Sequence, residues 1–371
     1  MDGTALLYCE GAFDTSVGKT AHGLVRFTER YRVLGVIDSG LSGRDAGDVL
    51  DGAPNGIPIF AGVREAVESL AETVDFLVVA FAPYGGRLTP EQRADVRQAL
   101  ELSLNVDSGL HQFLSDDEEL AALAAERGVR IRDVRRPPPV GEQHFFSGKI
   151  AEVTCPRLAV LGTDSMVGKR TTTLLTTRAL NAVGIRAAMV GTGQTAWLQG
   201  VRHGFCLDSL VTDFVTGELE HAVHTAFVEE DPDVILVEGQ GSLFHPAYAS
   251  GLSIIAAGRP AALILQHAPA RQGYAAFPQY PIVDLGRHIE TLELLAGVPV
   301  LAIAVNHEGI APDDRQQVMR ELESRYERPV VDPLTDGLPR LVDSIRALLS
   351  ELAGRSATPT EPRGAPGPAG R

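Results

Sequence analysis

LAVLGTDSMVGKRTTTLL, residues 158–175, is the stretch that decides the fold of this chain. It runs from an apolar segment typical of a buried strand, through a loop containing glycine, into a segment that predicts a helix. A loop in this position points backbone N–H groups at an anion, and the helix dipole adds to the attraction. Glycine permits close approach and lysine supplies a point charge. The stretch therefore predicts a phosphate-binding loop in an α/β domain.

The loop departs from the standard phosphate loop, GxxxxGK[ST], in two ways. Gly162 precedes Gly168 by one residue more than that pattern allows, and Arg170 stands where a hydroxyl residue would bind Mg²⁺. Arginine cannot ligate a cation, and a replacement threonine one residue later points about 100° away around the helix. We therefore expect anion binding without a metal ion. The residues expected to bind the phosphate-bearing ligand are Gly162, Thr163, Asp164, Gly168, Lys169, Arg170 and Thr171.

A near repeat of this stretch, LLYCEGAFDTSVGKTAHGLV, occupies residues 6–25. Asp14, Gly18 and Lys19 each lie 150 positions before their counterparts in the second loop. The first loop keeps Thr20 after the lysine but carries Phe13 in place of an ordinary loop glycine. Two interpretations stay open: a second anion site in which Lys19 binds substrate, or a structural turn.

The length of 371 residues is enough for two domains. In each half, short apolar runs alternate with helical patterns, which predicts crossover units and mostly parallel sheets covered on both faces. The Pro-rich segment RRPPPVGEQHFFSGKI, from Arg135, interrupts this alternation. We predict two doubly wound α/β domains at 1–136 and 157–354, a linker at 137–156 and a disordered tail at 355–371.

The net charge of −15 argues against a general nucleic-acid or membrane-surface binder, because both need a basic face. The three cysteines are scattered without CxxC spacing, which indicates neither a disulfide framework nor a zinc site. The N-terminus lacks the pattern of a signal peptide, and no run approaches the ~20 apolar residues of a membrane span. We expect a cytoplasmic protein that binds a small molecule and forms homo-oligomers.

Glu238 ends the apolar run VILVE and precedes a glycine-rich turn. Ligands of open α/β sheets bind at the carboxyl ends of strands, so this carboxylate is expected at the site opened by the loop at Gly162. It would hold Mg²⁺ in an ATP enzyme or act as general base toward an amine in acyl transfer. His245, in the same turn, is either a second candidate base or a capped surface histidine.

Further candidate substrate-binding residues follow other predicted strands. Gln194 lies in GTGQTAWLQG, a loop that either lines a pocket or packs around Trp197. Asp213 is either an N-cap or a binder of a cationic amine. Arg271 and Arg44 are candidates to pair with substrate carboxylates, although surface arginines near strand ends are common.

Together LGTDSMVGKRTT, VGTGQTAWLQG and VEGQGSLFHPAY resemble the bacterial DUF1611 family, and EGAFDTSVGKTAHGLVR resembles that family's first domain. The resemblance implies a Rossmann-like N-terminal domain and a P-loop NTPase-like C-terminal domain similar to dethiobiotin synthetase. Characterised members of the family are similar to D-glutamate N-acetyltransferases.

The resemblance thus implies transfer of acetyl from acetyl-CoA to an acidic amino acid, most simply D-glutamate. On this hypothesis Glu238 or His245 is the base and the second loop holds the phosphates of acetyl-CoA. The main alternative is an ATP-dependent ligase or kinase that uses Mg-ATP on a small carboxylate. A binding protein without turnover is the third class.

Overall fold

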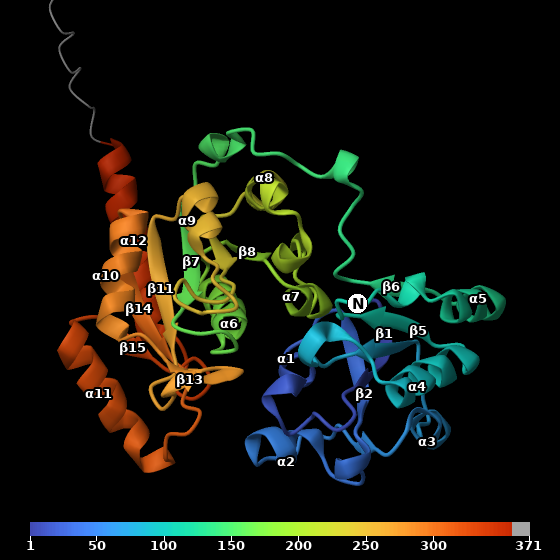
Figure 1. The fold of residues 1–371 in the computed structure, drawn as a ribbon. Helices are drawn as coiled ribbons and strands as arrows, with labels where there is room; N and C mark the ends of the chain where they lie inside the picture. The colour runs from blue at the N-terminus through green and yellow to red at the C-terminus, as the bar shows by residue number, and fades with distance from the viewer. Residues whose placement is uncertain (358–371) are drawn as a thin grey trace, which may run out of the picture.

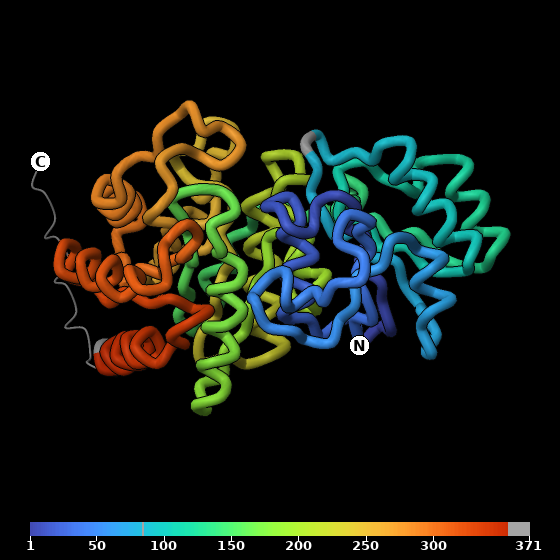
Figure 2. The backbone as a smooth tube through the Cα atoms, turned by 90° about the horizontal axis from the view of Figure 1, so that it is seen from below, coloured from blue at the N-terminus to red at the C-terminus, as the bar shows by residue number. Residues whose placement is uncertain are grey.

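The computed structural model describes the backbone of residues 1–357 and the side chains of residues 1–83 and 85–354. Figure 1 shows two α/β lobes, with the linker passing over the top between them. Figure 2, seen from below, shows the lobes side by side, with the N-terminus in one and the end of the described chain on the far side of the other. The fold class predicted from the sequence is confirmed.

The first lobe contains a parallel sheet with strand order β3-β2-β1-β4-β5-β6, the order of a Rossmann domain. Its strands are β1 (Gly3–Tyr8), β2 (Tyr31–Ile37), β3 (Ile59–Phe60), β4 (Phe76–Val79), β5 (Asn105–Ser108) and β6 (Ile131–Asp133). The helices α1 and α2 lie on one side of the sheet, and α3, α4 and α5 lie on the other (Figure 1). They span α1 (Lys19–Arg26), α2 (Ala46–Asp51), α3 (Val63–Ser69), α4 (Pro90–Glu101) and α5 (Glu118–Arg127).

The second lobe contains a parallel sheet with strand order β15-β14-β11-β7-β10-β8-β9 and a separate antiparallel hairpin, β12-β13. The sheet strands are β7 (Arg157–Gly162), β8 (Ala187–Gly191), β9 (His203–Gly204), β10 (Val234–Glu238), β11 (Ala262–His267), β14 (Val300–Val305) and β15 (Val330–Val331). The hairpin strands are β12 (Gly273–Tyr274) and β13 (Phe277–Pro281).

Helices cover both faces of this second sheet. One apolar core lies under α8, α9 and α10, and another lies under α6 and α12. The helices are α6 (Lys169–Ala182), α7 (Gln194–Leu198), α8 (Thr212–Glu230), α9 (Leu252–Gly258), α10 (Leu285–Ala296), α11 (Arg315–Tyr326) and α12 (Pro339–Ala357). None of the helices in the described part of the chain combines the length and apolar character needed to cross a membrane.

Helix α7 joins the lobes, because residues of the second lobe pack into the first. Leu198 is fully buried in the core of the first domain. The Trp197 ring lies between the guanidinium groups of Arg30, at 3.7 Å, and Arg132, at 4.4 Å. The Gln199 amide donates to the backbone oxygens of α1 at Gly23 (2.8 Å) and of Phe27 (2.7 Å). Figure 1 shows α7 against the first lobe.

Between the lobes, β6 ends at Asp133 and β7 begins at Arg157. The intervening segment docks on α8, where Glu220 accepts hydrogen bonds from the backbone N–H groups of Ser147 (2.7 Å) and Ile150 (3.0 Å). At the other end, α12 continues to Ala357, past the expected start of the tail at residue 355. The rest of the predicted tail, 358–371, lies outside the described residues.

Candidate active site

The second loop connects β7 to α6, and α6 begins at Lys169. Gly168 has φ 110°, a conformation that glycine adopts readily, and Met166 is also left-handed with φ 54°. The backbone N–H groups of Gly168, Lys169 and Arg170 have no hydrogen-bond acceptor within the part of the chain that the structure describes. Three unbonded donors at a helix N-terminus form an anion-binding site.

Lys169 lies over the end of β7. Its Nζ donates to the backbone oxygens of Asp164 and Gly241, both at 2.7 Å. A side chain at Gly162 would come within 3.0 Å of the Lys169 side chain, so glycine there makes room for the lysine. Burial lowers the pKa of Lys169 to about 7. Near neutral pH this lysine is therefore poised between its charged and neutral forms.

Arg170 points from α6 toward the first domain. A methyl group on Gly23 of α1 would come within 2.6 Å of its guanidinium, so the arginine packs directly on the glycine of that helix. Its Nε is buried and has no hydrogen-bond partner in the described structure. Burial lowers the pKa of Arg170, and the nearby Glu238 carboxylate opposes that shift. In standard phosphate loops this position supplies the hydroxyl that binds the metal ion. Here its side chain makes an interdomain contact instead.

The threonines after Arg170 do not restore a metal site. The Thr172 hydroxyl donates to the Gln266 side chain, and the hydroxyl of the half-buried Thr171 has no hydrogen-bond partner among the described residues. No group of three or more His, Cys, Asp or Glu side chains within the described chain is arranged to hold a metal ion. The hydroxyl that a standard phosphate loop places directly after its lysine is therefore missing at position 170.

Glu238 ends β10, which pairs with β7 on one side and with β8 on the other. Its Oε2 accepts the backbone N–H of Thr192, which follows β8, at 2.9 Å. The side chain is buried, and burial raises the pKa of Glu238, although the charges of Arg170, Lys169 and Lys19 oppose the shift. A buried carboxylate with a raised pKa at the carboxyl end of a strand is a candidate general base.

The first loop has a different internal structure from the second, although α1 also begins at its lysine, Lys19. The Asp38 carboxylate, at the end of β2, accepts the backbone N–H groups of Ala12 (3.2 Å) and Phe13 (3.0 Å). The Gly18 N–H, the counterpart of the free Gly168 donor, is bonded to the Thr15 backbone oxygen at 3.1 Å. The Lys19 N–H is bonded to the Ser16 backbone oxygen. The first loop is therefore a closed turn at this point.

Lys19 nevertheless belongs to the site. Burial lowers its pKa to about 8, and the charges of Arg135, Arg170 and Glu238 contribute to the value. Its Nζ has no hydrogen-bond or ion-pair partner among the residues that the structure describes. Next to it, the Thr20 hydroxyl lies 3.0 Å from the Thr195 hydroxyl of α7. The start of α1 thus lies against the second lobe at the domain boundary.

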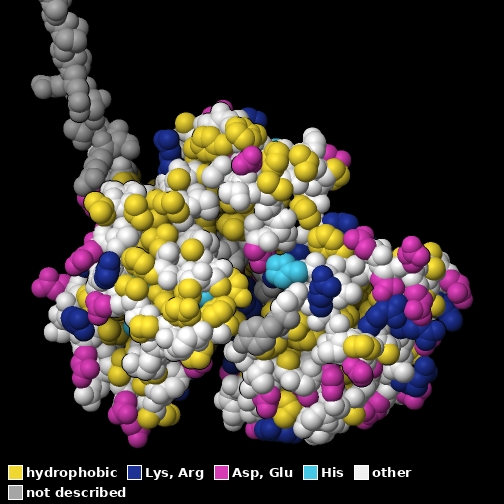
Figure 3. All heavy atoms as spheres, in the orientation of Figure 1, with side chains coloured by type: hydrophobic (Ala, Val, Ile, Leu, Met, Phe, Trp, Pro, Cys, Tyr) yellow, Lys and Arg dark blue, Asp and Glu magenta, His cyan; other side chains and the backbone are white. Residues whose placement is uncertain are grey.

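We call Lys19, Lys169, Arg170 and Glu238 the interdomain cluster. It combines three basic side chains from both lobes around one buried carboxylate. Figure 3 shows a groove between the lobes on one face of the molecule. At the edge of the cluster, Arg135 forms an ion pair with Asp208 across the boundary. The cluster can attract a polyanion and can exchange protons near neutral pH.

Other predicted residues form contacts that hold the second loop in position. The buried Asp164 carboxylate accepts Arg271 Nη1 at 3.0 Å and the Ala275 N–H at 2.9 Å, and His245 Nε2 lies 3.4 Å away. His245 Nδ1 accepts the N–H groups of Ala247 (3.1 Å) and Tyr248 (3.0 Å), so the ring proton is on Nε2. In this arrangement His245 has no lone pair free to act as a base.

Arg271 also donates to the backbone oxygens of Ser165 (3.0 Å) and Met166 (3.1 Å), which holds the loop in shape. The Thr163 N–H donates to the Gln266 backbone oxygen at 3.0 Å, and its hydroxyl lies 3.0 Å from His267 Nδ1. The binding role predicted for Asp164, Arg271 and Thr163 stays a prediction. The contacts found here are those of residues that position the loop.

The remaining candidates lie outside the cluster. Arg44 is exposed and pairs with Asp48 at 3.4 Å, and Asp213 is exposed in the first turn of α8. Gln194 is buried at the start of α7, against Gly109 of the first domain. Arg135 was not expected from the sequence at the site, because its Pro-rich surroundings indicated only a linker.

Comparison with known proteins agrees with this architecture. The DUF1611 Rossmann-like domain matches residues 39–137, and the DUF1611 P-loop domain, described as a domain of unknown function, matches residues 144–342. A crystal structure of a DUF1611 family protein from Anabaena variabilis has a TM-score of 0.85, with 28% sequence identity, and the match covers 94% of this chain and 100% of that one.

Two curated relatives are named D-glutamate N-acetyltransferase. The protein from Tritonibacter scottomollicae is 33% identical over 290 residues, which is 76% of this chain and 84% of the relative. The protein from a Pseudoalteromonas species is 29% identical over 303 residues, which is 78% of this chain and 88% of the relative. The relatives are therefore named as transferase enzymes. By its two domains and these relatives, the chain belongs to the DUF1611 family.

Proposed function

We propose that the protein is an N-acetyltransferase that moves acetyl from acetyl-CoA to the amino group of an acidic amino acid, D-glutamate being the first candidate. The observation that carries the proposal is the interdomain cluster, in which three basic side chains surround the buried carboxylate of Glu238. The names of the two relatives support the same reaction and the choice of D-glutamate.

The cluster suits acetyl-CoA as the cosubstrate. Its pyrophosphate and 3′-phosphate need cationic side chains and backbone N–H donors, and acetyl transfer needs no metal-assisted phosphoryl step. The free N–H groups at Gly168 and Lys169 supply the donors. Arg170 supplies a permanent charge at the position where an ATP enzyme would hold Mg²⁺. This arrangement favours acetyl-CoA over the alternative, Mg-ATP.

In the proposed reaction, the Glu238 carboxylate removes one proton from the substrate ammonium. The amine lone pair then attacks the thioester carbonyl carbon, so that the C–N bond forms and the oxygen carries the negative charge. Collapse of this intermediate breaks the C–S bond, and the second nitrogen proton goes to the leaving thiolate. Lys19, with its pKa lowered to about 8 by burial, is suited to relay that proton.

The test incubates the pure protein with D-glutamate and either acetyl-CoA or Mg-ATP, with L-glutamate and D-aspartate as comparison acceptors. We expect free thiol from the acetyl-CoA reaction and no ADP from the other. ADP release would favour the ligase or kinase, and consumption of neither cosubstrate would favour a binding protein without turnover.

The role of Glu238 has a sharper test. Glu238→Gln keeps the size of the side chain and removes its basicity, so we expect kcat to fall by about 10²- to 10⁴-fold. Affinity for acetyl-CoA should stay the same or rise slightly, because a negative charge leaves a basic cluster. The exposed Glu321→Gln on α11 is the matched control. Unchanged turnover in Glu238→Gln would exclude this carboxylate as the base.

A further inference from the structure

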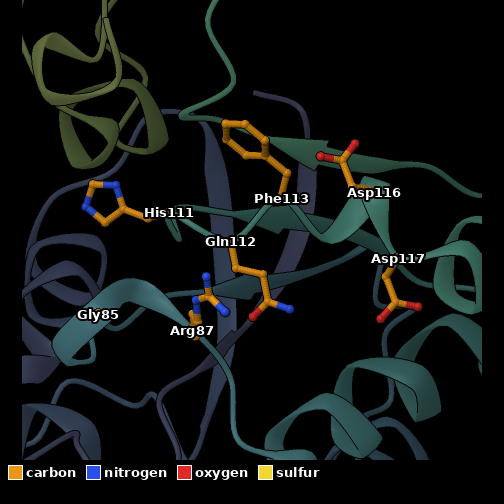
Figure 4. A pocket seen from close by; sticks show the side chains of 7 residues that line it. All are labelled: Gly85, Arg87, His111, Gln112, Phe113, Asp116 and Asp117. Carbon is orange, nitrogen blue, oxygen red and sulfur yellow. The ribbon is translucent and has the colours of Figure 1, made fainter.

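A cavity lies in the first domain, at the carboxyl ends of β4 and β5. Its volume is about 440 Å³, within the range of small-molecule sites, roughly 300–1,000 Å³. The residues that line it are Gly85, Arg87, His111, Gln112, Phe113, Asp116 and Asp117. In Figure 4 the Arg87 and Gln112 side chains extend into the same space, with His111 on one side and the two aspartates on the other.

The two acidic groups of this cavity form ion pairs with arginines outside it. Asp116 pairs with Arg136 at 2.6 Å, and Asp117 pairs with Arg93 at 2.7 Å. Arg87 is exposed and has no hydrogen bond or ion pair with any side chain that the structure describes. Arg93 also pairs with Glu119, and Arg136 lies 3.8 Å from Asp133. Arg87 is therefore the cation of the described cavity lining that is left for a ligand to meet.

The remaining polar groups are donors. Gln112 Oε1 accepts the Leu88 N–H at 3.1 Å, so the oxygen is occupied and the amide NH₂ is left to donate. Gly85 and Gly86 have φ of 77° and 63°, and a side chain on Gly86 would come within 2.7 Å of the His111 ring. Glycine at this turn lets the imidazole lie against the backbone beside Arg87. An arginine fork, an amide NH₂ and an imidazole together recognise a carboxylate or a phosphate.

The cavity is close to the interdomain cluster. Strand β4 is the neighbour of β1, whose loop carries Lys19, and all these loops open on the same edge of the sheet. The charges of Arg135 and Asp208 act on both His111 and Lys19, so the same ion pair is near both the cavity and the cluster. A ligand bound at the cluster can therefore extend toward the cavity.

We propose that this cavity is an anion-binding subsite, which holds a carboxylate or phosphate group of a ligand whose reacting end lies at the interdomain cluster. This proposal depends on the proposed function only in naming two sources of the anion. These are the carboxylate of the acceptor amino acid and the 3′-phosphate of acetyl-CoA. The shared chemistry is an oxyanion bound by Arg87 and the Gln112 amide.

The test measures equilibrium binding by calorimetry, with no turnover required, for D-glutamate, adenosine 3′,5′-bisphosphate and inorganic phosphate. Arg87→Met keeps the length of the side chain and removes its charge. Arg127→Met, on the exposed end of α5 outside the cavity, is the matched control. We expect Arg87→Met to weaken at least one probe roughly 10- to 100-fold, and Arg127→Met to leave all three unchanged.

Loss confined to D-glutamate assigns the subsite to the acceptor, and loss confined to the bisphosphate assigns it to the cosubstrate. Loss for phosphate alone also supports an anion subsite. The proposal is overturned if no probe that binds the wild-type protein is weakened by Arg87→Met, or if no probe binds at all. A protein that binds anions through Arg87 but transfers no acetyl group would overturn the proposed function and leave the subsite standing.

Discussion

Affinity for acetyl-CoA should fall as the pH rises from 7 to 9. Burial lowers the pKa of Lys169 to about 7 and that of Lys19 to about 8, from the ordinary value of 10.5. Over this range the charged fraction of Lys169 falls from about one half to about 1%, and that of Lys19 from about nine tenths to about one tenth. A bound anion stabilises the charged form of each lysine, so binding takes up protons and weakens with rising pH. Because a charge-assisted hydrogen bond contributes about 1.5–3 kcal/mol, the expected loss is roughly 10- to 100-fold.

The assay is calorimetry at constant ionic strength, at several values between pH 7 and pH 9. Phosphate groups have a second pKa near ~6, so the charge of acetyl-CoA is nearly constant over this range. Lys169→Met should bind more weakly at pH 7 and show a smaller pH dependence. Lys149→Met, in the linker, should behave as the wild type does. Constant affinity of the wild-type protein from pH 7 to pH 9 would contradict the argument, because ordinary lysines stay charged there.

Two substitutions test the loops themselves. Asp38→Ala leaves the N–H groups of Ala12 and Phe13 without their acceptor. The free energy of unfolding, measured by denaturant titration, should therefore fall by about 2–4 kcal/mol. A change below ~0.5 kcal/mol would contradict the closed-turn interpretation. Gly23→Ala places a methyl group within 2.6 Å of the Arg170 guanidinium, so acetyl-CoA affinity should fall several-fold, while the gain in helix propensity keeps the loss of stability below about 1 kcal/mol. Unchanged affinity would show that the contact between Arg170 and α1 has no effect on binding.

Long apolar strands were predictable from the sequence, and the polar strand β5 was not. Segments such as 74–82 and 233–239 contain the buried strands β4 and β10, because parallel strands covered on both faces need continuous apolar runs. The segment NVDS, which forms β5, reads as a turn by composition. Its Asp107 is nevertheless fully buried, because Arg132 and the Tyr31 hydroxyl both donate to its carboxylate. Only the tertiary structure supplies those partners.

For the site, the sequence placed Lys169, Arg170 and Glu238 at one edge of a parallel sheet, and the structure brings them together there. It left open whether Lys19 serves the same site, since no local pattern describes how two domains are oriented. The contacts of α7 decide that orientation, and they depend on residues far apart in the chain. For the same reason, the brace formed by Asp164, Arg271 and His245 was invisible in the sequence, where each residue resembled an independent candidate for ligand binding.

The two loops share a sequence pattern but have different roles in a single site. In the first loop the N–H groups of Gly18 and Lys19 are bonded to backbone oxygens of the loop itself, so they are not free to bind a phosphate. Lys19 instead lies among the charges of Arg170 and Glu238 in the other domain. In the second loop the donors stay free, and Arg170 replaces the residue that would bring a metal ion. A ligand held there would contact both lobes, so its binding should also strengthen the association of the domains.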